Sequence, residues 1–182
     1  IAAGLENDRA VIQAENEKDL AHGRQAGLSA AMLDRLRLDD RRMKAMIQGV
    51  REVIALKDPV GRVYDTRVRP NGLKIYKLTV PIGVIGIIYE SRPNVTVDAS
   101  ILTLKTGNAV ILRGGSESIN SNLALAATMG AALESAGLPR GSIQVLPTTD
   151  RAAVGALLKM DDLVDLIIPP GGEELIRRVV AE

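Results

Sequence analysis

Residues 80–98 indicate the architecture of this chain, and they read Val80-Pro-Ile-Gly-Val-Ile-Gly-Ile-Ile-Tyr-Glu-Ser-Arg-Pro-Asn-Val-Thr-Val-Asp98. The near-continuous aliphatic run Val84–Ile88 is typical of a strand that is buried on both faces of a parallel sheet. Polar residues and a proline follow the run at once, and a helical pattern starts near residue 95. The stretch therefore predicts a strand that passes through a polar turn into a helix.

The same pattern returns three times in the second half of the chain. The further aliphatic runs are Ala109–Leu112, Ile143–Leu146 and Val164–Ile168. Helices are expected at about residues 95–106, 118–136, 151–159 and 173–181. Four successive strand–helix units predict an α/β fold, with a doubly wound, parallel, Rossmann-like sheet over residues 81–182.

The first half predicts helices over residues 1–58, where charged residues are denser than later in the chain. One helix is expected through Val11 and Leu20, and Ser29 is a suitable N-cap for a short helix that reaches Leu36. A third helix shows apolar residues at helical spacing, which predicts one buried face. That face consists of Met43, Met46, Ile47, Val50 and Ile54.

A β-hairpin is predicted over residues 59–80. Its strands would be Gly61–Arg69 and Leu73–Val80, on either side of Pro70-Asn71-Gly72. Asn-Gly between two alternating runs is a hairpin signal because both residues tolerate a positive φ. An isolated hairpin leaves a long open edge, which favours pairing with another chain or domain.

Composition excludes several kinds of site. The 182 residues include no cysteine and one histidine, His22, so the chain offers no thiolate metal site, no histidine cluster and no cysteine nucleophile. The net charge of +1 gives no reason to expect nucleic acid as a partner. No apolar run reaches 18 residues and no secretory signal is visible, so neither a membrane span nor export is expected. The chain begins at Ile1, and its native start is expected to be missing.

The turns that follow the strands are the candidate binding sites, because ligands of parallel sheets bind beyond the carboxyl ends of the strands. Arg113 ends one strand, and Gly114, Gly115 and Ser116 follow it, which suits a phosphate group. The alternative is an arginine that pairs with a nearby acid. Gly171-Gly172 before an acidic helix start is a second phosphate candidate, whose alternative is a plain tight turn. A GxGxxG fingerprint is absent.

The turn after Val84–Ile88 carries a second group of polar residues. Glu90 could act as a general base, and Arg92 could hold a carboxylate or a phosphate. A salt bridge between these two neighbours is the simpler alternative. Asn94 precedes a helix and is most simply its N-cap.

Residues 80–98 closely resemble γ-glutamyl phosphate reductase, also called glutamate-5-semialdehyde dehydrogenase, a member of the aldehyde dehydrogenase superfamily. Further matching stretches are Ala26–Leu36, Asp58–Gly61, Leu104–Glu117 and Ile167–Gly172. The resemblance implies a cytoplasmic enzyme of proline biosynthesis that reduces L-glutamyl 5-phosphate with NADPH to glutamate 5-semialdehyde and phosphate. It also implies a homo-oligomer, with the hairpin as the oligomerisation element.

The resemblance further implies which residues hold the cofactor. In related aldehyde dehydrogenases, a lysine at the strand end and an acid three positions later hold the adenosine ribose. Arg113 and Ser116 occupy these positions here, and they would accept a 2′-phosphate that an acid would repel, which favours NADPH over NADH. The other expected cofactor contacts are Tyr89, Glu90, Gly114, Gly171 and Gly172. The expected substrate contacts are Ser91, Arg92 and Asn94.

The nucleophile that the resemblance implies is a cysteine of a catalytic domain, which this chain lacks. We therefore expect the chain to be the N-terminal and cofactor-binding portion of such an enzyme, inactive on its own. The alternative is a free-standing, non-catalytic dinucleotide-binding module.

Overall fold

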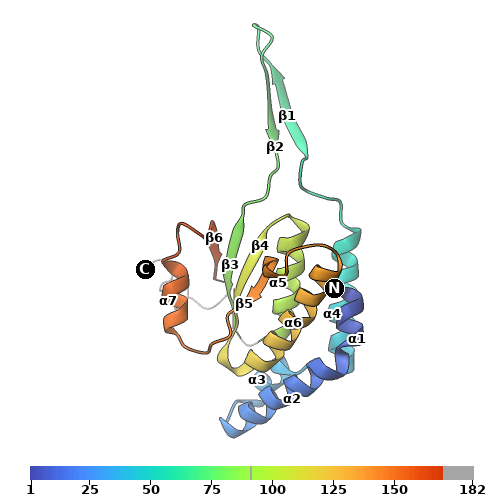
Figure 1. The fold of residues 1–182 in the computed structure, drawn as a ribbon, viewed down its shortest axis with the longest axis vertical. Coiled ribbons are helices and arrows are strands. Elements are labelled where there is room, and N and C mark those ends of the chain that lie inside the picture. The colour runs from blue at the N-terminus through green and yellow to red at the C-terminus, as the bar shows by residue number, and fades with distance from the viewer. Residues whose placement is uncertain (91, 170–182) are drawn as a thin grey trace.

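A computed structural model describes residues 1–90 and 92–169 of the chain. Its centre is a four-stranded parallel sheet with the strand order β5-β4-β3-β6 (Figure 1). The strands are β3 (Val84–Ile88), β4 (Ala109–Arg113), β5 (Ile143–Val145) and β6 (Leu166–Ile168). The predicted α/β fold with a parallel sheet is confirmed.

The direction in which strands are added reverses at β3. The chain first places β4 and β5 on one side of β3, and then returns to place β6 on its other side. In sheets of this kind, ligands bind outside the carboxyl ends of the strands at the point of reversal. The turn after β3 is therefore well placed for a binding site.

Helices cover both faces of this sheet (Figure 1). Helices α5 (Pro93–Lys105) and α6 (Ile119–Ser135) pack on one face, and α7 (Ala152–Leu158) packs on the other. The larger core includes Ile85, Ile87, Val97, Ile101, Val110, Leu112, Leu125 and Met129. A smaller cluster on the α7 face is formed by Ile88, Val154, Leu157 and Val164. Two apolar faces explain why the strands read as continuous aliphatic runs. The helix expected at 173–181 lies outside the described residues.

The first part of the chain forms four helices that extend the α5–α6 layer. They are α1 (Ala2–Asn7), α2 (Arg9–Gln25), α3 (Ala30–Leu36) and α4 (Asp40–Ala55). The predicted cap of α3 is confirmed, since Ser29 Oγ accepts a hydrogen bond from the Met32 N–H at 3.3 Å. Four of the five predicted core residues of α4 are buried, but Ile54 is 65% exposed. Ile54 lies in the last turn of α4, at the rim of an apolar groove that no other described residue fills.

The hairpin consists of β1 (Val63–Val68) and β2 (Lys74–Leu78), and it projects away from the rest of the fold (Figure 1). Both strands are exposed along their whole length. Of the turn residues, Gly72 has a positive φ of 85°, whereas Asn71, which also tolerates a positive φ, does not adopt one. The proline ring restricts the φ angle of Pro70 to about −65°. The Gly72 N–H donates to the Arg69 carbonyl at 2.9 Å and so closes the turn.

Side chains from two other loops hold the segment that joins the hairpin to β3. Asn108 Oδ1 accepts hydrogen bonds from the N–H groups of Ile82 at 2.6 Å and Gly83 at 2.9 Å. Asp165 Oδ2 accepts from the Val84 N–H at 2.7 Å. A Cβ atom at residue 83 would lie 2.1 Å from that carboxylate oxygen, so the close approach requires glycine. The backbone of residues 82–84, which leads into β3, is therefore held by hydrogen bonds to Asn108 and to Asp165.

The start of α6 is held by a carboxylate from α2. Asp19 is 1% exposed, and its Oδ1 accepts from the Asn120 N–H and side-chain amide at 3.1 and 2.7 Å. Its Oδ2 accepts from the Ser121 N–H and hydroxyl at 2.8 and 2.5 Å. The first turn of a helix has N–H groups without an internal partner, and a negative charge there is favourable. Asp19 thus caps a helix that begins about a hundred residues later in the chain.

Asp19→Ala should lower the free energy of unfolding by roughly 3 kcal/mol, because buried N–H and hydroxyl groups lose their acceptor. Urea unfolding followed by circular dichroism measures the change. Asp161→Ala is the matched control, since Asp161 is exposed, and it should stay within about 0.5 kcal/mol of the parent chain. An Asp19→Ala loss as small as that of the control would contradict the capping role.

Candidate functional site

Arg113 is the last residue of β4 and lies at the carboxyl edge of the sheet. Its guanidinium donates to the Gly114 carbonyl at 2.8 Å and to the Thr149 carbonyl at 3.3 Å. Its Nε is buried and has no hydrogen-bond partner among the described residues. No ion pair involves Arg113 in residues 1–90 and 92–169. Two backbone carbonyls therefore orient a guanidinium whose charge the described part of the chain leaves unneutralised.

Gly114 lets the loop after β4 lie directly on a buried polar network. A Cβ atom at this position would be 2.2 Å from Asn122 Nδ2 and 3.1 Å from the Tyr89 hydroxyl. Below the loop, the Tyr89 hydroxyl and Thr96 Oγ1 are 2.7 Å apart, and Thr96 donates to Asn122 Oδ1 at 2.8 Å. Asn122 Nδ2 donates to Ser118 Oγ at 3.0 Å. The side chain of Tyr89 supports the loop from beneath, and its contact with a cofactor stays a prediction.

The sequence interpretation missed one residue of this loop, Glu117. Its carboxylate accepts from the Ser116 hydroxyl at 3.1 Å, and its oxygens would lie 2.8–3.0 Å from a Cβ atom at residue 115. Glu117 thus folds back over Gly115 and places a negative charge close to Ser116. The sequence shows that Glu117 follows Ser116, but it does not show that the Glu117 carboxylate turns back toward Ser116.

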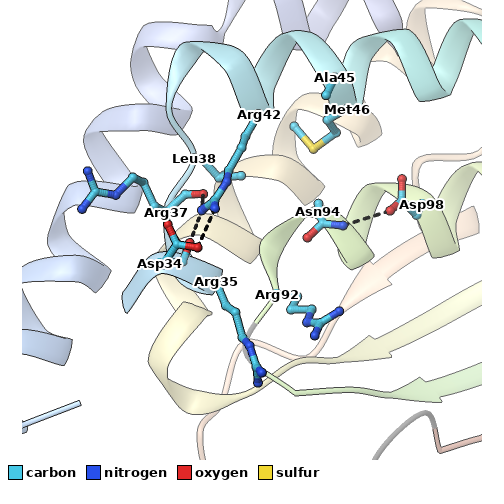
Figure 2. Close-up of a pocket in the computed structure, with 10 residues that line it drawn as sticks. All are labelled: Asp34, Arg35, Arg37, Leu38, Arg42, Ala45, Met46, Arg92, Asn94 and Asp98. Atoms are coloured by element: carbon cyan, nitrogen blue, oxygen red, sulfur yellow. Dashed lines mark hydrogen bonds and ion pairs between the residues drawn. The ribbon is translucent and has the colours of Figure 1, made fainter. Parts of the chain in front are cut away.

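A pocket of about 400 Å³ opens beside this edge, between α3, α4 and the start of α5 (Figure 2). It contains two of the predicted substrate contacts, Arg92 and Asn94. The pocket is lined by Asp34, Arg35, Arg37, Leu38, Arg42, Ala45, Met46, Arg92, Asn94 and Asp98. The third predicted contact, Ser91, lies outside the described residues, as do Gly171 and Gly172. Their assigned roles stay predictions.

The turn after β3 departs from two simple expectations. No ion pair joins Glu90 to Arg92 in the described structure, where the Arg92 N–H instead donates to the Glu90 carbonyl at 2.7 Å. Asn94 is not the N-cap of α5, because the helix already begins at Pro93. Proline suits the first helical position, where its missing N–H costs nothing. Asn94 instead donates to Asp98 Oδ2 at 3.1 Å, one turn further along α5.

The pocket has one internal ion pair, between Arg42 and Asp34. The Arg42 guanidinium lies 2.8 Å from Asp34 Oδ2 and also donates to the Arg37 carbonyl at 3.1 Å (Figure 2). The hydrogen bond from Arg42 and its positive charge hold the pKa of Asp34 below its ordinary value. Both charges are therefore already balanced within the wall of the pocket.

The described residues lack two kinds of feature. In residues 1–90 and 92–169, no group of three or more His, Cys, Asp or Glu side chains is arranged to hold a metal ion. Within the same residues, no helix combines the length and the apolar character that a bilayer span requires.

Comparison with known proteins gives consistent matches. The aldehyde dehydrogenase family profile matches residues 24–182. A γ-glutamyl phosphate reductase from Desulforapulum autotrophicum is 56% identical over 180 residues, which are 99% of this chain and 43% of that protein. The crystal structure of the γ-glutamyl phosphate reductase from Thermotoga maritima superposes with a TM-score of 0.95 at 44% identity, over 99% of this chain and 44% of that one.

A second solved structure, the γ-glutamyl phosphate reductase from Saccharomyces cerevisiae, gives a TM-score of 0.85 at 35% identity, over 98% of this chain and 45% of that one. These matches confirm the resemblance carried by residues 80–98. The chain spans less than half the length of each of these three relatives.

The buried side chain of Tyr89 should make the free energy of unfolding depend on pH in the alkaline range. Burial raises the pKa of Tyr89 to about 12, although the hydrogen bond with Thr96 opposes the rise. A tyrosine in the unfolded chain ionises near about pH 10. The neutral phenol of Tyr89 therefore contributes its full stabilisation of the folded state below about pH 10, and this contribution is lost as the pH rises toward about 12. The stability difference between the parent chain and Tyr89→Phe should shrink by roughly 2 kcal/mol between about pH 8 and about pH 11.5.

Urea unfolding of both proteins at the two pH values measures this difference. Tyr76→Phe is the control, because Tyr76 is exposed on the hairpin, and its difference from the parent chain should not change with pH. A constant difference for Tyr89→Phe would show that the phenol is not desolvated.

Proposed function

The chain belongs to the aldehyde dehydrogenase family, and on this basis we propose that it is the N-terminal, cofactor-binding portion of a γ-glutamyl phosphate reductase. The complete enzyme would reduce L-glutamyl 5-phosphate to glutamate 5-semialdehyde and release phosphate, a step of proline biosynthesis in the cytoplasm. NADPH, when bound, supplies the hydride for this reduction. A cysteine outside this chain would carry the acyl group as a thioester after phosphate leaves.

The observation that carries the proposal is the environment of Arg113. Two backbone carbonyls orient its guanidinium, and its buried Nε lacks a partner among the described residues. Arg113 is partly buried, and a phosphate group would give its guanidinium the counter-ion that the described residues do not supply. Gly114 beside it holds the loop against Asn122 and Tyr89, which keeps the backbone at the end of β4 in a fixed position. These features fit the 2′-phosphate of NADPH.

Ser116 and Glu117 act in opposite directions on the choice of cofactor. Ser116 stands where related dehydrogenases have an acid, which favours a 2′-phosphate. The carboxylate of Glu117 lies against Ser116 and disfavours one. We therefore propose that the preference for NADPH depends on Arg113 outweighing Glu117.

The remaining roles of this proposal follow the organisation of the chain. Residues 1–58 and 81–182 would form the NADPH-binding unit, with Tyr89, Glu90, Gly114, Gly171 and Gly172 as further cofactor contacts. Ser91, Arg92 and Asn94 would contact the substrate. The hairpin over residues 59–80, with its exposed strands, would join subunits of a homo-oligomer.

A second candidate function is a free-standing dinucleotide-binding module without catalysis, which the parallel sheet with its reversal at β3 would also fit. Both functions predict that the isolated chain binds NADPH and reduces no glutamyl phosphate. They differ in the complete protein that contains these residues. Phosphate-dependent reduction of NADP⁺ by that protein with glutamate 5-semialdehyde supports the reductase, and its absence supports the module.

Arg113→Glu should weaken the binding of NADPH to the chain by roughly tenfold or more, and that of NADH by clearly less, because the 2′-phosphate meets a negative charge. Titration calorimetry with both cofactors measures the two affinities. Arg51→Glu is the control for the change in net charge, since Arg51 lies on the exposed side of α4. An unchanged NADPH affinity in Arg113→Glu would remove Arg113 from the site.

A further inference from the structure

The pocket of Figure 2 offers unpaired charges of both signs to a ligand. Arg35 and Arg92 form no ion pair with any carboxylate in residues 1–90 and 92–169, and both are exposed. Asp98 accepts a hydrogen bond from the neutral amide of Asn94, and no cation of the described structure pairs with it. A ligand that carries both a negative and a positive group would match this arrangement.

The carboxylate of Asp98 indicates which positive group a ligand would need. It is partly buried on α5, and this burial raises its pKa, while the hydrogen bond from Asn94 opposes the rise. A carboxylate that has lost water and gained no cation is destabilised in its charged form. A ligand ammonium group would supply the missing cation.

The backbone next to Arg35 is held in place by hydrogen bonds from α2. Asn16 accepts from the Leu38 N–H at 2.7 Å and donates to the Leu36 carbonyl at 2.8 Å, which fixes the backbone directly after Arg35. Asp34 is already bonded to Arg42 and so does not neutralise Arg35. In Figure 2 the side chains of Arg35 and Arg92 both lie below the Arg42–Asp34 ion pair, with Arg35 running downward and Arg92 to the right. Their planar guanidinium groups suit a carboxylate.

We propose that this pocket binds the α-amino-acid end of the substrate, with Arg35 and Arg92 on the α-carboxylate and Asp98 on the α-ammonium group. The inference rests on the proposed reductase function and deepens it, because it names the residues that select an amino-acid substrate. A volume of about 400 Å³ suits a small ligand. Arg92 lies four residues after the carboxyl end of β3, and the other end of the glutamyl chain would then extend toward the sheet edge where Arg113 lies.

The test uses the complete protein that contains this chain, assayed in the direction of aldehyde oxidation with NADP⁺ and phosphate. Glutamate 5-semialdehyde is compared with 5-oxopentanoate, which keeps the carboxylate and lacks the amino group. Asp98→Asn keeps the shape of the side chain and removes its charge. It should lower kcat/KM for glutamate 5-semialdehyde by roughly tenfold or more, and leave that for 5-oxopentanoate within about twofold.

Arg35→Gln should lower kcat/KM for both substrates by roughly tenfold, because both carry the carboxylate. Arg51→Gln is the matched control, since Arg51 lies on the exposed side of α4 and does not line the pocket. It should change neither value by more than about twofold. Circular dichroism and the unfolding midpoint verify that each variant is folded.

Three outcomes would overturn the inference. Equal losses for both substrates in Asp98→Asn, or no loss for either, would remove the ammonium contact. Unchanged values in Arg35→Gln would remove the carboxylate contact. A parent protein that oxidises neither aldehyde would overturn the reductase function itself. A parent protein that is active while its variants behave like it would overturn only the assignment of the pocket.

Discussion

The buried carboxylate of Asp19 is the contact on which the arrangement of the helical layer depends. It reaches from α2 to the first turn of α6 and satisfies four donors of Asn120 and Ser121. Helix α6 in turn covers one face of the sheet and contributes Asn122 to the network beneath Gly114. An unpaired carboxylate at this depth would be strongly destabilising, so the two helices have one favourable relative position.

Two neighbouring residues of α6 connect this contact to both candidate sites. Ser121 accepts a hydrogen bond from Asn16 at 2.9 Å, and Asn16 also holds the backbone on either side of Arg37, at the wall of the arginine-lined pocket. Asn122 accepts from Thr96 and lies under the loop that follows Arg113. One turn of a helix thus sets the spacing between the proposed substrate pocket and the proposed cofactor loop. The relative position of two reacting molecules matters for hydride transfer, and here it would depend on rigid secondary structure.

The sequence predicted the features whose cause is local. Aliphatic runs gave the four strands, and Ser29 was identified as a cap because its acceptor role depends on residues three positions away. The contact of Asp19 with α6 joins residues a hundred positions apart, and no local pattern reports it. The arginine pocket was missed for the same reason, since Arg35 and Arg92 come from distant segments. Asn94 was misread as a cap because Pro93 had already started the helix.

The hairpin and the clamp on residues 82–84 together have a mechanical consequence. A force on the tip of a projecting two-stranded arm produces its largest bending moment where the arm leaves the body. Asn108 and Asp165 grip the chain at that base, immediately before the central strand begins. Bending of the arm would therefore be absorbed around Thr79–Pro81 and would not shear β3 against its neighbours. We therefore expect forces on the arm to have little effect on the sheet edge that carries both candidate sites.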